Sequence, residues 1–194
     1  MNPTITLTED GDGESFIKEA IGTLENSKVY VGIPEAETNR KKNKKEAVTN
    51  AGLLFIHTNG SPIRHIPARP VIEPSIEANH ESLEEGLHAA AGLVLDGEKY
   101  KAEVMLKKVG TLGANGAKAW FTDPRNGWRQ NAPSTIRRKL GKLTGKRRRK
   151  ALDILNSVDE NMPLVGTSAL DEINTPLIDT AQMRRAITHV EEFA

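Results

Sequence analysis

One stretch of the chain carries so much positive charge that it cannot form part of a core. Between Pro133 and Lys150, nine side chains are Lys or Arg and none is acidic. Such a block repels itself, so it stays solvated or faces a polyanion. The cations with which we expect it to contact DNA or an acidic partner are Arg137, Arg138, Lys142, Lys146, Arg147, Arg148, Arg149 and Lys150.

The block has two interpretations, which both remain open. Lys and Arg that neutralise phosphates give sequence-independent, salt-sensitive affinity for DNA. Alternatively, the block is a solvated helical arm or docks on an acidic neighbour. No base-reading motif accompanies it, so sequence-specific regulation is not expected.

The rest of the composition predicts one thin core. Of the 194 residues 37% are hydrophobic and 4% aromatic, with a mean hydropathy of -0.48. This length suits one domain that carries an arm, ordered in part by neighbouring subunits. The chain has no cysteine, which excludes disulfides and thiolate chemistry. It has no apolar run of bilayer length and no leader-like start, so we expect a soluble protein made in the cytoplasm, without membrane partners.

The first half predicts two helices and a strand. Apolar residues recur at helical spacing over residues 14–24 and alternate over residues 29–33. Residues 35–46 are polar and basic, which is typical of a loop. A second helix is expected over residues 46–58, with Asn59-Gly60 at its end. The side chains expected to face inward from it are Val48, Ala51, Leu54 and Phe55.

Prolines and turn residues divide the remainder. Three prolines make residues 61–70 a stiff connector, and helices are expected over residues 74–95 and from Asp96-Gly97 to Leu112. Residues 113–133 are expected to be a loop. Short helices are expected after Ser134, over residues 147–156 and after Thr180, followed by an extended segment, THVEEF.

The fold class expected from these elements is α+β, a helix-rich single domain with a small antiparallel sheet and an extended basic helical insertion. Residues 1–141 would form the first part of the core and residues 142–174 the inserted arm. Residues 175–194 would complete the core with a helix and a strand.

Candidate metal ligands lie on the expected third helix. Glu77 precedes His80, and Glu85 precedes His88, at a spacing used by carboxylate-bridged metal bundles. Those bundles take one such pair from each of two facing helices, whereas both pairs here lie on one helix. We therefore expect a solvated polar face, with no metal and no cofactor.

The glycines of GTLGANGAK resemble a phosphate loop only in composition. Gly110, Gly113 and Gly116 do not have the spacing of a Walker loop, so a flexible turn is expected. No G-x-S-x-G elbow is present either. The motifs therefore indicate a protein that is not an enzyme.

Three further side chains have both a functional and a structural interpretation. A histidine such as His65 can serve as a pH-sensitive group, but a single histidine in a connector is usually a surface or packing residue. Trp120 and Trp128 lie among cations and could stack on nucleic-acid bases. We favour both tryptophans as core or interface anchors, because large aromatics dominate buried contacts.

Four segments carry a family resemblance, in the order VYVGIPE, NAGLLFIHTNGSPIRHIPARPVIEPSIE, NAPSTIRRK and PLIDTAQMRRAIT. They span most of residues 28–190. The chain resembles the minor tail, virion-morphogenesis or neck proteins of tailed phages. The resemblance implies a non-enzymatic virion subunit, assembled in the host cytoplasm into a homo-oligomeric ring at the head–tail junction or head-proximal tail end. Its implied partners are other neck and tail proteins and genomic DNA in the channel.

Within the resemblance, the connector and the C-terminal motif are the expected subunit interface. Arginine forks bind carboxylates or carbonyls, and an aspartate can cap the terminal helix. The residues are Pro67, Ala68, Arg69, Pro70, Leu177, Asp179, Thr180 and Arg184.

The chain departs from the family pattern at two places. Ala181 stands where the family favours glycine, so a left-handed or sharply turned glycine is not required there and entry into the helix is easier. The usual short link between STIRRK and PLIDT is expanded to include residues 142–174, and the role of this insertion is not implied by the family.

Overall fold

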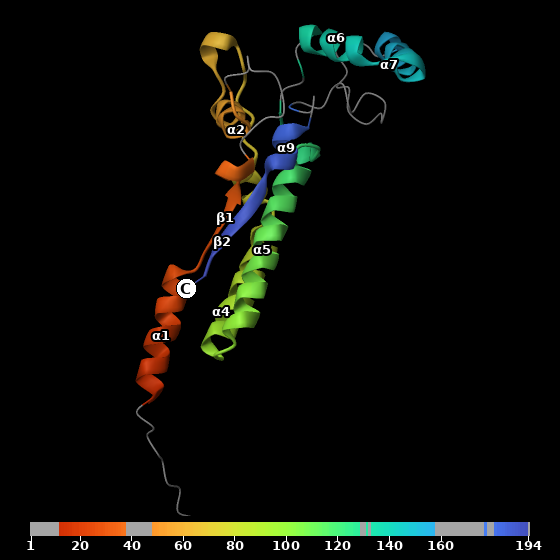
Figure 1. The fold of residues 1–194 in the computed structure, drawn as a ribbon. Coiled ribbons are helices and arrows are strands. Elements are labelled where there is room, and N and C mark those ends of the chain that lie inside the picture. Colours follow the sequence, from red (N-terminus) through yellow and green to blue (C-terminus); the bar gives the residue numbers. More distant parts are fainter. Residues whose placement is uncertain are drawn as a thin grey trace, which may run out of the picture.

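The structure is a computed structural model, which describes residues 12–37, 48–128, 131, 133–157, 177 and 181–193. The fold is helix-rich α+β with a two-stranded antiparallel sheet, as expected from the sequence. None of the described helices is long and apolar enough to cross a membrane. In chain order the elements of Figure 1 are α1 (Asp12–Asn26), β1 (Lys28–Gly32), η1 (Glu35–Glu37), α2 (Asn50–Asn59), η2 (Pro62–Arg64), α3 (Ile72–Glu77), α4 (His80–Leu95), α5 (Lys99–Trp120), η3 (Pro124–Asn126), α6 (Pro133–Lys142), α7 (Gly145–Ser157), α9 (Gln182–Ala186) and β2 (Thr188–Glu192).

The antiparallel pair α4 and α5 forms the long axis of an elongated molecule (Figure 1). Leu83 and Ala90 of α4 and Leu106 and Val109 of α5 are buried between the helices or against the sheet. The helix α1 packs on α4 at the end of this pair, where Ala20 joins a second apolar cluster. The thin core is therefore spread along an axis.

The sheet lies on α5, with one face buried and one exposed. Strand β1 pairs with β2 so that Tyr30 is opposite Val190 and Val31 is opposite His189. Val31 and His189 approach the glycines of α5, whereas Tyr30 and Val190 are about half exposed on the other face. The alternation over residues 29–33 therefore predicted the strand and its buried face.

The long helices depart from their expected bounds. The helix expected over residues 74–95 is two helices, α3 and α4, separated by a turn at Ala78 and Asn79. The helix expected to end at Leu112 continues to Trp120, so the loop expected from residue 113 is wrong over its first eight positions, 113–120. Leu87 of α4 and Leu112 of α5 are more than a third exposed.

The flexible turn expected from the glycines is also wrong, because Gly110, Gly113 and Gly116 all lie within α5. A Cβ at Gly113 would lie 2.9 Å from Val31 Cγ2, and one at Gly110 would collide with the ring of His189. These glycines let the sheet approach the helix backbone. The resulting packing outweighs the low helix propensity of glycine.

The helix α2 begins at Asn50, later than expected, because the Thr49 hydroxyl accepts a 3.0 Å hydrogen bond from the amide of Gly52 and caps it. Phe55 is 69% exposed and Val48 is also exposed, so both were wrongly expected to face inward. Leu54 packs against the main apolar cluster. Gly60 ends the helix with a positive φ of 73°, as Asn59-Gly60 indicated.

Candidate functional site

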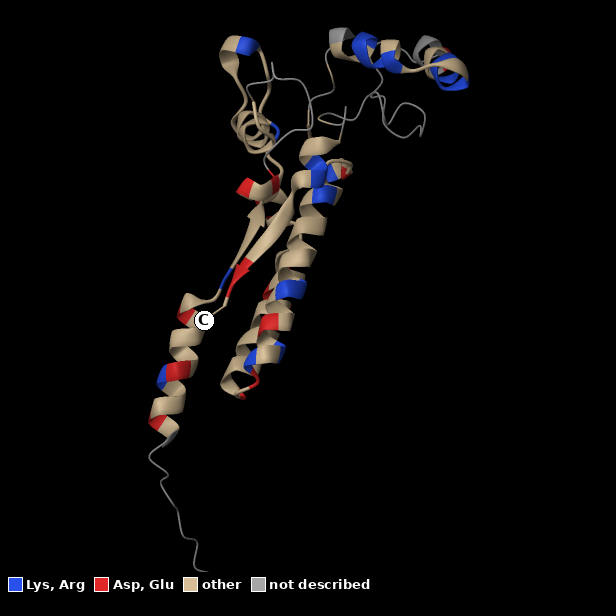
Figure 2. Cartoon of the chain, viewed as in Figure 1, with Lys and Arg blue, Asp and Glu red and all other residues tan. Residues whose placement is uncertain are grey.

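A cationic end carries most of the residues marked by the charge pattern. The helices α6 and α7 lie together at the end of the molecule away from α1 (Figure 1). Figure 2 shows the Lys and Arg residues of both helices in blue. Lys139 and Ala151 are buried on these helices, so each has an inner face. All eight cations that we expected to contact DNA or an acidic partner are exposed: Arg137, Arg138, Lys142, Lys146, Arg147, Arg148, Arg149 and Lys150.

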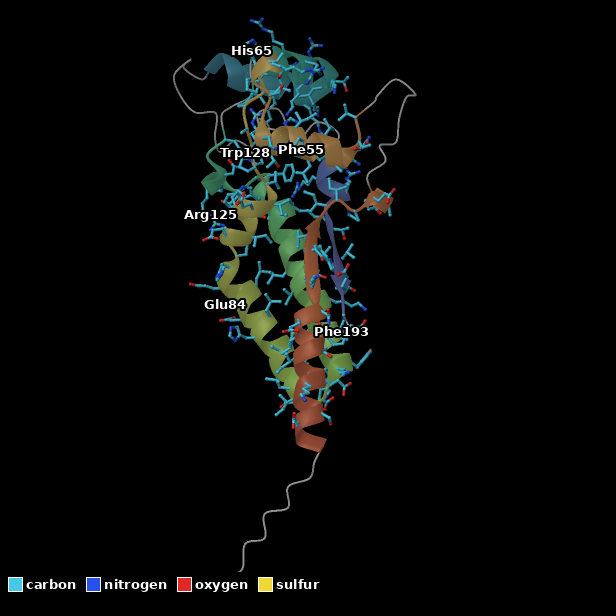
Figure 3. The ribbon with its side chains drawn as sticks, turned by 90° about the vertical axis from the view of Figure 1, so that its left-hand side faces the viewer. Phe55, His65, Glu84, Arg125, Trp128 and Phe193 are labelled. Carbon is cyan, nitrogen blue, oxygen red and sulfur yellow. The ribbon has the colours of Figure 1, made fainter. Side chains whose placement is uncertain are left out.

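The connector begins at the same end with a closed turn. Ser61 and Ile66 exchange two backbone hydrogen bonds of 2.8 and 2.9 Å, and His65 is left-handed with a φ of 52°. The turn η2 breaks the fully extended course expected from the prolines. It presents Ile63, which is 94% exposed, beside Arg64. His65 lies on the surface near the level of α6 and α7 (Figure 3), in agreement with its expected surface role.

The structure brings the connector and the C-terminal motif together in one apolar joint. Val71, which follows the connector, is fully buried with Phe121, Met183 and Ile187. Leu177 packs against the same cluster. Two segments more than 100 residues apart in the sequence thus meet, and the joint unites α2, α5 and α9 within one chain.

Arg184 acts inside this joint. Its Nε donates a 2.8 Å hydrogen bond to the carbonyl oxygen of Lys118, in the last turn of α5. The last four carbonyls of a helix have no intrahelical partner, and a cation near them is favourable. Arg184 therefore ties α9 to α5.

Arg69 and His57 form a buried polar pair. The backbone amide of Arg69 donates a 2.6 Å hydrogen bond to the carbonyl of His57, and the Arg69 side chain is 7% exposed. Burial lowers the pKa of the guanidinium. Burial and the positive charge of Arg69 lower the pKa of His57. Both effects favour the neutral imidazole over its charged form.

The expected interface residues differ in accessibility. Ala68 is exposed, whereas Pro67, Pro70, Leu177 and Arg184 are partly buried. Asp179 and Thr180 lie outside the described residues. The contact of the expected interface residues with another subunit stays a prediction. Within one chain, the backbone amide of Arg69 already binds the carbonyl of His57, and the Arg184 side chain binds the carbonyl of Lys118.

Ala181 corrects a sequence expectation. It immediately precedes α9 and is left-handed, with a φ of 56° and a ψ of 11°. We expected that a left-handed or sharply turned glycine was not required here. A glycine would adopt the observed conformation without the clash that a Cβ makes.

Both tryptophans serve as anchors, as expected. Trp120 is 7% exposed, and the guanidinium of Arg125 lies 5.6 Å from the centroid of its ring. Arg125 also makes a forked contact with Asp123, at 3.0 and 2.7 Å. Trp128 packs edge-on to Phe121 with 5.9 Å between ring centroids. Trp128 packs against the apolar cluster of the joint, whereas Arg125 lies at the surface (Figure 3). Trp120 is thus buried, and Trp128 is partly buried.

The histidines of the third-helix motifs point to a shared glutamate. His80 Nδ1 lies 3.5 Å and His88 Nε2 lies 3.7 Å from carboxylate oxygens of Glu84, and all three side chains are more than half exposed. Glu77 and Glu85 are exposed and make no such contact with these histidines. Among the described residues no three His, Asp or Glu side chains are grouped to hold a metal ion.

Sequence reasoning missed the open sheet. No described element besides β1 pairs with β2, so each strand has one edge without a described partner. The alternation that predicted β1 contains a signal for an uncovered side of this sheet, because it places Tyr30 at an outward position. No protein-family model, curated protein or solved structure matches this chain.

Proposed function

We propose that this chain is a structural virion subunit of a tailed phage, acting in a ring of identical copies at the head–tail junction or head-proximal tail end. The resemblance over residues 28–190 supports this role. The structural observation that carries it is the amount of large apolar surface left uncovered in the described part of the chain. Tyr100 is 78%, Phe55 69% and Ile63 94% exposed, and both outward sheet residues are about half exposed.

Uncovered apolar side chains in a protein with a thin core favour a chain that buries them against neighbours. Phe55 and Ile63 lie on α2 and η2 at the cationic end, and Tyr100 lies at the opposite end of α5 (Figures 1 and 3). A subunit with apolar side chains at both ends of its long axis suits a layer between two other components. The partners proposed are portal-side or head-closure proteins and the tail terminator.

Native mass spectrometry of the purified chain, combined with deletion of its gene in the phage, tests this role. We expect a single closed oligomer from the chain. Without the gene we expect filled heads and free tails that do not join. A monomer at assembly concentrations, together with joined infectious particles from the deletion, would contradict the proposal.

A second candidate function, non-specific DNA binding in packaging or in the channel, is favoured by the exposed cations of α6 and α7. Five consecutive cations open α7, from Lys146 to Lys150, and all are exposed. Each phosphate neutralised would add about 0.9 to the slope of log K against log salt.

Replacing Arg147, Arg148 and Arg149 with Gln tests this candidate. We expect weaker duplex binding and a slope reduced by about 2 to 3, for any sequence of DNA. The matched control replaces Lys18, Lys101 and Lys108, exposed cations on α1 and α5, with Gln. Equal affinity for the two triple variants would count against a DNA-binding arm.

A further inference from the structure

The two open edges of the small sheet suggest how neighbouring copies meet. We propose that β1 of one copy pairs antiparallel with β2 of the next, so that the sheets join across the ring interface. This inference rests on the proposed ring. It places the contact between copies on the two strands and not on the expected interface residues of the connector and the C-terminal motif.

Both edges present pairing groups in the described part of the chain. Each strand has five residues and pairs only with the other, and α5 covers one face of both. In an antiparallel pair, alternate residues direct their N–H and C=O groups toward the partner, and the residues between direct theirs outward. An edge of this kind is a template for another strand unless it is covered.

The register within the chain is also available between chains. Because bonded and non-bonded positions alternate, the positions that are not hydrogen-bonded inside one copy are those that point outward on both strands. An outer β1 edge therefore fits an outer β2 edge in the same alignment. Lys28 then faces Glu192 of the next copy, and Tyr30 faces Val190.

Charge favours this pairing over a symmetric one. Strand β1 carries Lys28 and no acid, whereas β2 carries Glu191 and Glu192. Two β2 strands side by side would gather the carboxylates of both copies, which is unfavourable, while β1 against β2 alternates the charges. The half-exposed Tyr30 and Val190 would also form a continuous apolar row.

Unlike edges give a heterologous contact. Each copy offers one β1 edge and one β2 edge, so every pairing leaves a free edge of each kind until the assembly closes. The contact therefore does not stop at a dimer, and it gives the proposed ring when the rotation between successive copies closes.

Cysteine cross-linking tests the pairing cleanly because the chain has no cysteine. Tyr30→Cys and Val190→Cys single variants, carrying tags of different mass, are co-expressed and oxidised. Residues directly opposite in antiparallel strands have Cα atoms about 4.5 to 5.5 Å apart, within disulfide range. We expect a mixed-tag disulfide dimer, formed at about a quarter of interfaces if copies mix at random.

The controls distinguish the proposed strand register from disulfides that form by random collision of exposed cysteines. Each single variant alone should give no linked dimer, and Tyr100→Cys with Val190→Cys should give none, although Tyr100 is more exposed than Tyr30. The double variant Tyr30→Cys/Val190→Cys should form an intrachain bond, which verifies that both cysteines react. Circular dichroism checks that the single variants remain folded.

Three outcomes would overturn the inference in distinguishable ways. A closed oligomer without a mixed-tag dimer would remove the strand pairing and leave the ring. Linked dimers from either variant alone would show symmetric pairing instead. A monomer with no linked product would remove both the ring and this contact.

Discussion

Arg184 Nε lies 2.8 Å from the carbonyl oxygen of Lys118 and donates a hydrogen bond to it across the junction of α9 and α5. This bond connects the C-terminal motif to the helix that supports the sheet. Since β2 follows α9 directly, the bond also helps to place β2 beside β1.

Arg184→Ala should lower the free energy of unfolding by about 1.5 to 3 kcal/mol, because a partly buried hydrogen bond from a charged donor to the last turn of α5 is lost. Urea denaturation of the isolated protein measures this change. Arg185→Ala is the control, since Arg185 is exposed, and should change stability by less than about 0.5 kcal/mol. Equal losses in the two variants would show that the bond contributes nothing specific.

Ala181→Gly should raise the free energy of unfolding by about 1 kcal/mol, because glycine adopts the left-handed conformation without a Cβ clash. Thermal denaturation of the variant gives the change. Ala89→Gly, at an exposed position inside α4, should be destabilising by roughly 0.5 to 1 kcal/mol. A loss of stability at Ala181 similar to that at Ala89 would refute a left-handed residue there.

Gly113→Ala should destabilise the fold by about 1 to 3 kcal/mol, because the new Cβ would lie 2.9 Å from Val31 Cγ2. Gly92→Ala in α4 meets nothing within 4 Å and should be neutral or stabilising by about 0.5 to 1 kcal/mol. Comparing the urea midpoints of the two variants distinguishes close packing of the sheet from a general intolerance of alanine.

The stability of the fold should decrease as the pH falls below the ordinary pKa of His57, 6.5. The pKa of His57 is lower in the folded chain, by burial and the charge of Arg69, so the unfolded chain binds the proton first. The stabilisation is thus complete above pH 6.5 and lost as the pH falls through the folded pKa.

His57→Gln should flatten this dependence between pH 7.5 and 5, measured by urea denaturation against the wild type at each pH. His88→Gln removes an exposed histidine and should keep the wild-type slope. A wild-type slope that persists in His57→Gln would assign the acid sensitivity to other groups.

The sequence predicted the elements whose pattern is local. The period-2 alternation around Val29 and Val31 marked β1, and the helical spacing at Ala20 and Leu24 marked α1. Eight of the nine cations in the block are exposed on α6 and α7, as their charge density predicted, whereas Lys139 is buried. Within the candidate site, the sequence also marked the connector and the C-terminal motif, and the structure brings these two segments together.

Other features depended on contacts between distant segments. Gly110 and Gly113 are locally poor helix residues, and they remain helical because β1 and β2 pack against them. The left-handed conformation of Ala181 is likewise not a local preference of alanine, because a Cβ clashes there.

By itself, then, the sequence determined that residues 14–24 are helical, that residues 29–32 are extended and that most cations of α6 and α7 are solvated, since these features depend on periodicity and charge within a few residues. The tertiary structure alone decided that Arg69 and Arg184 are used inside one chain and that the sheet keeps two open edges. The burial of a side chain and the pairing of a strand both depend on contacts with segments that are distant in the sequence. The spacing of residues along the chain does not contain that information.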